Sequence, residues 1–185
     1  MIDELLADAK RRMGKSVDAT GHEFNTVRTG RAAAALLDRI QVDYYGEKTP
    51  LNQLATINVP EPRMLTVQPF DPGAMEGIER SILESDLGLT PSNDGKIIRL
   101  PIPSLTEERR KELVRVVRQL AEDGRVSIRN VRRDVMSDLK ELARDGEVGS
   151  DEEHRAEDRL QKYTDGSVAQ IDELLERKEE EILEV

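Results

Sequence analysis

The chain has no cysteine and only two histidines, His22 and His154, among its 185 residues. Without cysteine, the protein can form neither disulfide bonds nor thiolate metal sites. No apolar run approaches the roughly 20 residues that a helix needs to cross a bilayer. The first ten residues include three carboxylates where a targeting peptide would be basic. We therefore expect a cytoplasmic protein that does not enter the membrane and that has no metal or other cofactor.

Charged residues make up 36% of the chain and hydrophobic residues 37%, a mixture that favours long amphipathic helices over disorder. The net charge is −10, but it is unevenly distributed. Residues 1–144 contain 23 basic and 23 acidic side chains, whereas residues 145–185 contain 5 basic and 15 acidic ones. Because the acidic excess lies at the C-terminal end, the remainder of the chain can carry a local basic face that binds nucleic acid.

Three stretches have the apolar periodicity of long helices: residues 2–28, residues 104–145 and a segment that starts after Gly149. In each stretch, apolar side chains recur every three or four residues, which places them on one face of a helix. The middle helix, at about 40 residues, would be a rod of roughly 60 Å. A rod of that length is not buried by itself, so we predict that the three helices form a bundle.

The starts of the second and third helices have the pattern of a capping box. In this motif a Ser or Thr caps the first turn, and a Glu three residues later bonds back to the cap. Ser104 with Glu107 fits the second helix, and Ser150 with Glu153 fits the third. We therefore expect Ser104 and Ser150 to be the N-cap residues.

The segment between Gly30 and Ser104 differs in composition, because it contains all eight prolines of the chain. Runs with β-strand character alternate there with turn residues, and one short run fits a helix. We predict an α+β protein in which a small β/α/β domain, residues 30–104, is inserted into the three-helix bundle of residues 1–29 and 105–185. The predicted strands cover 39–45, 55–59, 64–70 and 96–102, the short helix covers 74–86, and a turn covers 91–95.

Two chain crossings join these predicted domains, at Thr29-Gly30 and at Pro103-Ser104. Glycine absorbs a change in backbone angles without a steric penalty, whereas proline restrains it. A joint of this kind bends in few directions. We therefore predict that Thr29, Gly30, Pro103 and Ser104 form a hinge.

The middle helix carries an unusual concentration of arginine. Between residues 109 and 133 there are nine basic side chains against three acidic ones, and all but one of the nine are arginine. At about 100° per residue, five of these arginines occupy one sector beside the apolar face, with Arg115 and Arg133 on its far flank. The planar guanidinium grips phosphate with two hydrogen bonds and stacks on bases, which favours an RNA-binding surface over a solvated face with intra-bundle salt bridges. The five are Arg110, Arg118, Arg125, Arg129 and Arg132.

Five segments of the chain, in order, resemble the signature segments of the ribosome recycling factors. They are 27–32 (VRTGRA), 43–46 (DYYG), 86–89 (DLGL), 105–110 (LTEERR) and 126–134 (VSIRNVRRD). The resemblance extends over essentially the whole chain. It implies an L-shaped two-domain monomer that is not an enzyme. Such a factor binds the large ribosomal subunit and, with elongation factor G and GTP hydrolysis by that partner, dissociates post-termination ribosomes from mRNA.

The resemblance also assigns roles to individual residues. Arg110, Arg129 and Arg132 match the arginine positions that face large-subunit rRNA, and Arg28 and Arg31 flank the junction within the first motif. Together with the remaining members of the arginine sector and its flank, the expected rRNA-binding residues are Arg28, Arg31, Arg110, Arg118, Arg125, Arg129, Arg132 and Arg133.

Two other classes of protein fit part of the pattern. A helical-bundle adaptor or chaperone would bind protein clients largely independently of the arginines, whereas an rRNA-binding protein loses affinity with salt. An enzyme using the inserted domain would need a pocket with convergent titratable groups, and no phosphate loop, nucleophile motif or metal-ligand pair is present. We expect His22 and His154 to lie on helix surfaces, and at least one of Tyr44 and Tyr45 to be in the core, because strand neighbours point to opposite faces.

Overall fold

The computed structural model describes residues 1–184, and the chain forms two compact units. The helical unit consists of residues 1–28 and 107–184, and the small unit begins at Thr29 and ends at Thr106. The junctions that the sequence predicts, after residues 29 and 104, differ from these positions by one and two residues. Among the described residues, no helix has a segment long and apolar enough to cross a bilayer.

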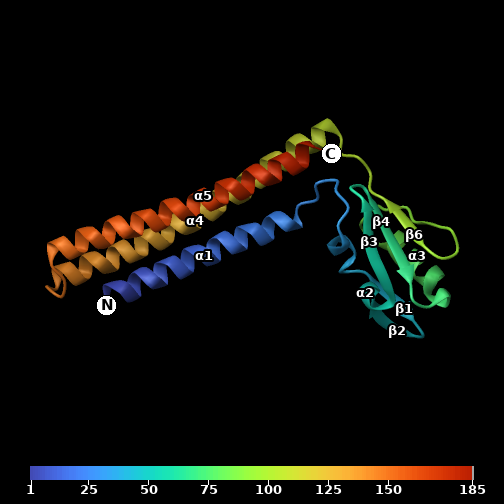
Figure 1. The fold of residues 1–185 in the computed structure, drawn as a ribbon, viewed down its shortest axis with the longest axis horizontal. Coiled ribbons are helices and arrows are strands. Elements are labelled where there is room, and N and C mark those ends of the chain that lie inside the picture. The colour runs from blue at the N-terminus through green and yellow to red at the C-terminus, as the bar shows by residue number, and fades with distance from the viewer. Residues whose placement is uncertain (185) are drawn as a thin grey trace. The chain divides into compact units, whose positions relative to one another are not determined.

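The helical unit is a three-helix bundle, as the apolar periodicity predicted. It contains α1 (Ile2–Thr26), α4 (Glu107–Arg144) and α5 (Ser150–Leu183), and each helix packs against the other two (Figure 1). Burial of one apolar face per helix, at about 25 cal/mol per Å² of apolar surface, drives their association. The leucine, isoleucine and methionine side chains with no exposure to solvent in this core are Leu6, Met13, Ile128, Leu139, Leu160, Ile171 and Ile182.

Gly124 interrupts the apolar face of α4 because the bundle leaves no room there for a side chain. A Cβ at this position would lie 2.2 Å from Oγ1 of Thr20 on α1 and 2.8 Å from Cδ1 of Ile171 on α5. Both distances are far below van der Waals contact. Among the glycines of the bundle helices, Gly124 is the one at which an added Cβ would clash, and the clash involves both neighbouring helices.

The two predicted N-caps are wrong, because each helix begins at a different residue from the one expected. α4 begins at Glu107, three residues after Ser104, whose hydroxyl instead accepts a hydrogen bond from the Arg63 guanidinium. α5 begins at Ser150, and its N-cap is Gly149. The Gly149 N–H donates to the Glu152 carboxylate at 3.2 Å, which is the backward half of a capping box displaced by one residue.

The small unit contains an antiparallel four-stranded sheet with the order β3-β4-β6-β5 and a separate β1-β2 hairpin. Four of its six strands, β1, β3, β4 and β6, overlap the four predicted runs, and the predicted helix is α3, two residues shorter at its C-terminal end. The elements are β1 (Gln41–Tyr44), β2 (Glu47–Pro50), α2 (Leu51–Leu54), β3 (Ala55–Glu61), β4 (Met64–Pro69), α3 (Met75–Glu84), β5 (Ser92–Asn93) and β6 (Ile98–Pro101), with 3₁₀ turns at Ala34–Leu37 and Pro72–Ala74.

The small unit has its own apolar core. Alternate residues of β4 and β6 are buried, so that Leu65, Val67, Ile98 and Leu100 point to one face of the sheet. Ile78 and Ile82 of α3, together with buried residues of β1, α2 and the turns, complete the same cluster. Each unit thus buries a core within its own residues.

The strand β2 was not predicted from the sequence, because its residues have no apolar alternation. It is formed by pairing with β1, in the register Tyr44↔Glu47 to Gln41↔Pro50. The two-residue turn between the strands has positive φ at both positions, 48° at Tyr45 and 83° at Gly46. These angles define the type of hairpin turn whose twist matches that of the strands, and tyrosine is an unusual residue for the first position.

Candidate nucleic-acid interface

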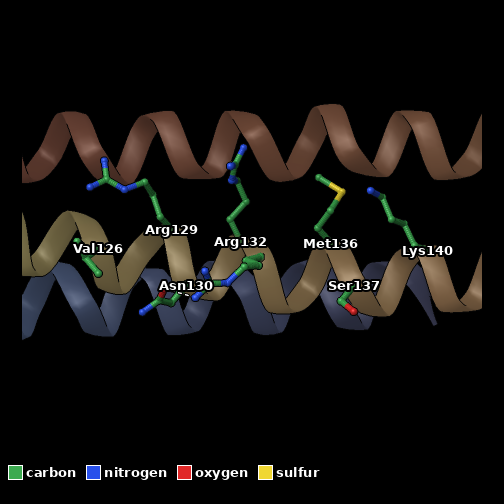
Figure 2. A pocket seen from close by; sticks show the side chains of 8 residues that line it. Val126, Arg129, Asn130, Arg132, Met136, Ser137 and Lys140 are labelled. Carbon is green, nitrogen blue, oxygen red and sulfur yellow. Dashed lines mark hydrogen bonds between the residues drawn. The ribbon is translucent and has the colours of Figure 1, made fainter.

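An open hollow lies on the outer surface of α4, along the four turns that follow Val126. Every residue that lines it belongs to α4, and α5 and α1 run along its two sides (Figure 2). Its lining contains four cationic side chains, two apolar ones and two neutral polar ones, and no carboxylate. The residues are Val126, Arg129, Asn130, Arg132, Arg133, Met136, Ser137 and Lys140.

The cations of the hollow differ in their hydrogen-bond partners. Arg129 donates to the carboxylate of Glu122, and this bond, with the one from Arg125, lowers the pKa of Glu122. Arg132 Nη1 donates to the amide oxygen of Gln161 on α5 at 2.8 Å, and Arg133 Nη2 donates to the Asn130 amide oxygen at 2.7 Å. Within residues 1–184, Arg132, Arg133 and Lys140 have no carboxylate at salt-bridge distance.

Two members of the predicted arginine sector pair with carboxylates of the neighbouring helix. Arg118 Nε donates to Glu179 Oε1 at 2.5 Å, and Arg125 Nε donates to Asp172 Oδ1 at 2.9 Å. These bonds raise the pKa of both guanidinium groups. The alternative interpretation of the sector, intra-bundle salt bridges, therefore describes Arg118 and Arg125.

The other predicted rRNA-binding arginines are Arg110, Arg28 and Arg31. Arg110 is in the first turn of α4, and its Nε is buried without a hydrogen-bond partner among the described residues. Arg28 is exposed and follows α1 in the helical unit, whereas Arg31 is exposed and belongs to the small unit. Within the helical unit, the structure thus places Arg129, Arg132 and Arg133 together at one hollow, whose lining does not include Arg28 or Arg110.

The residues at the predicted hinge have distinct environments. Thr29 is buried, and Gly30 has a positive φ of 78°, a conformation that favours glycine. In the small unit, the β3–β4 turn contacts the chain on both sides of the insertion. Ala32 N–H donates to the Pro62 carbonyl at 2.7 Å, and Ile102 N–H donates to the Arg63 carbonyl at 2.8 Å.

The remaining candidates from the sequence form no reactive cluster. Tyr44 is half-buried and donates its hydroxyl to Asp71 at 2.8 Å, whereas Tyr45 is 86% exposed. The hydrogen bond from Tyr44 lowers the pKa of Asp71, although the Gly73 N–H contributes more. His22 and His154 are exposed on α1 and α5, as expected. Within the described residues, no three His, Asp or Glu side chains are grouped so that they could hold a metal ion.

Sequence reasoning missed several residues of this surface. Lys140, Met136 and Val126 line the hollow although the arginine pattern does not include them. Gln161, which bonds Arg132, lies on a different helix and has no local signal. The ion pairs of Arg118 and Arg125 could have been found from the spacing of charged residues in the two antiparallel helices. Arg118 and Arg125 are separated by seven residues, as are Asp172 and Glu179.

Comparison with known proteins identifies close relatives along the entire chain. The ribosome-recycling factor of Rubrobacter xylanophilus is 58% identical over 180 residues, covering 97% of each chain, and that of Shouchella clausii is 55% identical over 185 residues, covering 100% of each. A solution structure of the ribosome recycling factor is 42% identical with a TM-score of 0.75, covering 100% of this chain and 98% of the other.

A second solved structure describes the T. thermophilus ribosome recycling factor and the E. coli elongation factor G bound to the E. coli post-termination complex. The matching chain is 50% identical with a TM-score of 0.65, and the match covers 99% of both chains. The sequence model of the family described as "Ribosome recycling factor" matches residues 20–183. These findings confirm the resemblance carried by the five sequence segments: the chain belongs to the ribosome recycling factor family, whose members are translation factors of ribosome recycling and not enzymes.

Proposed function

We propose that this protein binds rRNA of the large ribosomal subunit through the hollow on α4. We further propose that, with elongation factor G and the GTP hydrolysed by that partner, it dissociates post-termination ribosomes from mRNA. The partners are supported by the relative at 50% identity, whose structure is described together with elongation factor G on a post-termination complex. Ribosomes as the target also favour a cytoplasmic location.

The observation that carries the rRNA proposal is the lining of the hollow, which has four cations and no carboxylate. In a chain of net charge −10, a surface of this kind attracts phosphate only where acidic side chains are excluded. Val126 and Met136 add apolar surface on which an unstacked base can rest, and Asn130 supplies a neutral polar group. Phosphate, base stacking and hydrogen bonding are the contacts by which proteins hold irregular RNA.

We expect the predicted arginines to contribute unequally to rRNA binding. Arg129, Arg132 and Arg133 provide the phosphate contacts together with Lys140, and Figure 2 shows Arg129, Arg132 and Lys140 extending from α4 on the side that faces α5. Arg118 and Arg125 contribute less, because carboxylates of α5 engage their guanidinium groups. Arg129 is paired with Glu122 of its own helix, so it contributes less than Arg132, Arg133 and Lys140, which have no carboxylate partner among residues 1–184. We retain Arg28, Arg31 and Arg110 as secondary contacts on the basis of the family resemblance.

We also propose that Thr29, Gly30, Pro103 and Ser104 allow the small unit to move relative to the helical unit during recycling. The hydrogen bonds of Ala32 and Ile102 to the β3–β4 turn restrict the backbone on the small-unit side of both crossings. Changes in backbone conformation are then confined to the few residues between these hydrogen bonds and the helices. A short hinge of this kind transmits force from one unit to the other, with α4 as the lever.

The double substitution Arg129→Ala and Arg132→Ala tests the proposed surface. Each change removes a charge-assisted contact worth about 1–3 kcal/mol, so binding to purified large subunits should weaken by tenfold or more. The dependence of the binding constant on salt should also become shallower. Arg155→Ala, which removes an exposed arginine from α5, is the matched control and should bind normally.

Co-sedimentation over a series of salt concentrations measures both quantities, and circular dichroism verifies the fold. Wild-type affinity of the double variant at physiological salt would contradict the rRNA proposal. Binding that is indifferent both to salt and to these arginines would instead favour the helical-bundle adaptor.

A further inference from the structure

The arginines of α4 and the carboxylates of α5 follow matching spacings. Arg118, Arg125 and Arg132 are seven residues apart on α4, and Glu179, Asp172 and Asp165 are seven residues apart on α5. Seven residues are close to two helical turns, so each set forms one stripe along its helix. The two helices are antiparallel neighbours (Figure 1). The two stripes therefore predict three successive ion pairs between them.

Only the first two of these pairs form. Arg118 bonds Glu179, and Arg125 bonds Asp172 through both Nε and Nη2. The third position breaks the pattern: Arg132 bonds the amide oxygen of Gln161 at 2.8 Å, and the amide nitrogen of the same Gln161 donates to Asp165 Oδ1 at 2.8 Å. The neutral side chain of Gln161 thus forms hydrogen bonds with both members of the expected ion pair, Arg132 and Asp165.

We propose that Gln161 is a positioning residue for rRNA binding, because it separates Asp165 from Arg132 and so keeps the charge of Arg132 uncompensated. This inference rests on the proposed role of the α4 hollow. Gln161 satisfies the guanidinium with an amide oxygen, which carries no net charge. Arg132 then reaches a phosphate by exchanging a neutral hydrogen bond, whereas Arg118 and Arg125 must first give up an ion pair.

The same arrangement accounts for where along α4 phosphate is bound. Carboxylates of α5 neutralise the charges of Arg118 and Arg125. At Arg132, which lines the hollow, the α5 partner is the uncharged Gln161 instead. The acidic C-terminal helix thereby confines the basic surface to one short segment. A confined patch discriminates against nonspecific RNA, whose binding grows with the number of phosphates neutralised.

Two substitutions of Gln161 in the full-length chain test the inference, with affinity for purified large ribosomal subunits as the measurement. Gln161→Glu places a carboxylate on Arg132. Gln161→Ala releases Asp165 to pair with it. Each should weaken binding roughly two- to fivefold, the range expected when an exposed ion pair must be broken. Each should also make the salt dependence shallower.

The rescue variant is Gln161→Ala combined with Asp165→Asn, which removes both the amide and the competing carboxylate. It should bind at least as well as the wild type, and a purely structural role for Gln161 does not predict this recovery. Glu179→Gln, which releases Arg118 from its carboxylate, should raise affinity and steepen the salt dependence. Circular dichroism melts verify that all variants are folded.

Arg132→Ala, measured in parallel, separates failure of this inference from failure of the proposed function. If Arg132→Ala binds like the wild type, Arg132 does not contact rRNA, and both proposals are overturned. If Arg132→Ala weakens binding while Gln161→Glu and Gln161→Ala do not, the rRNA surface stands and the role of Gln161 is overturned. Failure of Asp165→Asn to restore binding to a folded Gln161→Ala protein also overturns it.

Discussion

Gly124→Ala should destabilise the helical unit, although alanine is the better helix former. In an open helix interior this change contributes about 1 kcal/mol of stability through backbone entropy. At Gly124 the new methyl group would lie 2.2 Å from Oγ1 of Thr20 and 2.8 Å from Cδ1 of Ile171. Because these atoms belong to two different helices, α4 cannot move away from one without approaching the other.

The magnitude follows from comparing the two effects. Overpacking of a well-filled core typically costs about 1–3 kcal/mol, which offsets or exceeds the gain of about 1 kcal/mol in helix propensity. Thr20 has little freedom to rotate away, because it is buried and its hydroxyl donates to the Ser16 carbonyl at 2.9 Å. Subtracting the gain of about 1 kcal/mol leaves an expected net loss of up to about 2 kcal/mol in the free energy of unfolding.

Gly166→Ala on α5 is the matched control, since a Cβ there meets nothing within 4 Å. It should stabilise the bundle by about 0.5–1 kcal/mol. Denaturant unfolding followed by far-ultraviolet circular dichroism measures both variants, because the three long helices dominate that signal. Adding Thr20→Ala to Gly124→Ala should recover part of the loss. Equal or greater stability of Gly124→Ala relative to Gly166→Ala would refute the close-packing argument.

Three further predictions concern the small unit, the division into units and the junction. Asp94 accepts hydrogen bonds from the N–H groups of Ile97 and Lys96 and from Arg99, which lower its pKa to about 2. Its stabilising contribution is therefore present above its unfolded pKa of 3.8 and is lost as pH falls towards about 2. Asp94→Asn should make unfolding less pH-dependent in this window, and an unchanged dependence would contradict this assignment. Residues 1–28 and 107–184, joined by a short linker, should melt cooperatively as a helical protein, and a disordered product would refute the division. Two glycines inserted after Leu105 should leave large-subunit binding intact and reduce subunit splitting measured by light scattering, whereas undiminished splitting would contradict the lever.

The helices of the bundle could be predicted from the sequence because amphipathic periodicity is a local property. Met13 and Val17 on α1, like Leu113 and Val117 on α4, recur at helical spacing and are buried as expected. The strands with buried alternation, such as β6, were recognised for the same reason. The N-cap residues could not be predicted in this way. Ser104 fits a capping box in the sequence, but its hydroxyl accepts a hydrogen bond from Arg63, forty-one residues away in the chain.

What the amino-acid sequence by itself determined is the set of elements that each carry their own pattern. These are the three one-sided helices, the proline-containing insert and the concentration of arginine between residues 109 and 133. The family could also be recognised at this level, because its signature segments are contiguous in the chain. Neither conclusion required knowing which residues of distant elements become neighbours.

Only the tertiary structure decided which arginines remain uncompensated. Arg125 and Arg132 are equivalent in the helical periodicity of α4, yet one bonds a carboxylate and the other a neutral amide of α5. The glycine at position 124 likewise has no local explanation and is required by contacts with two other helices. The physical reason is common to both cases: an ion pair or a steric limit depends on the register between packed helices, and that register is set by the fit of their buried faces.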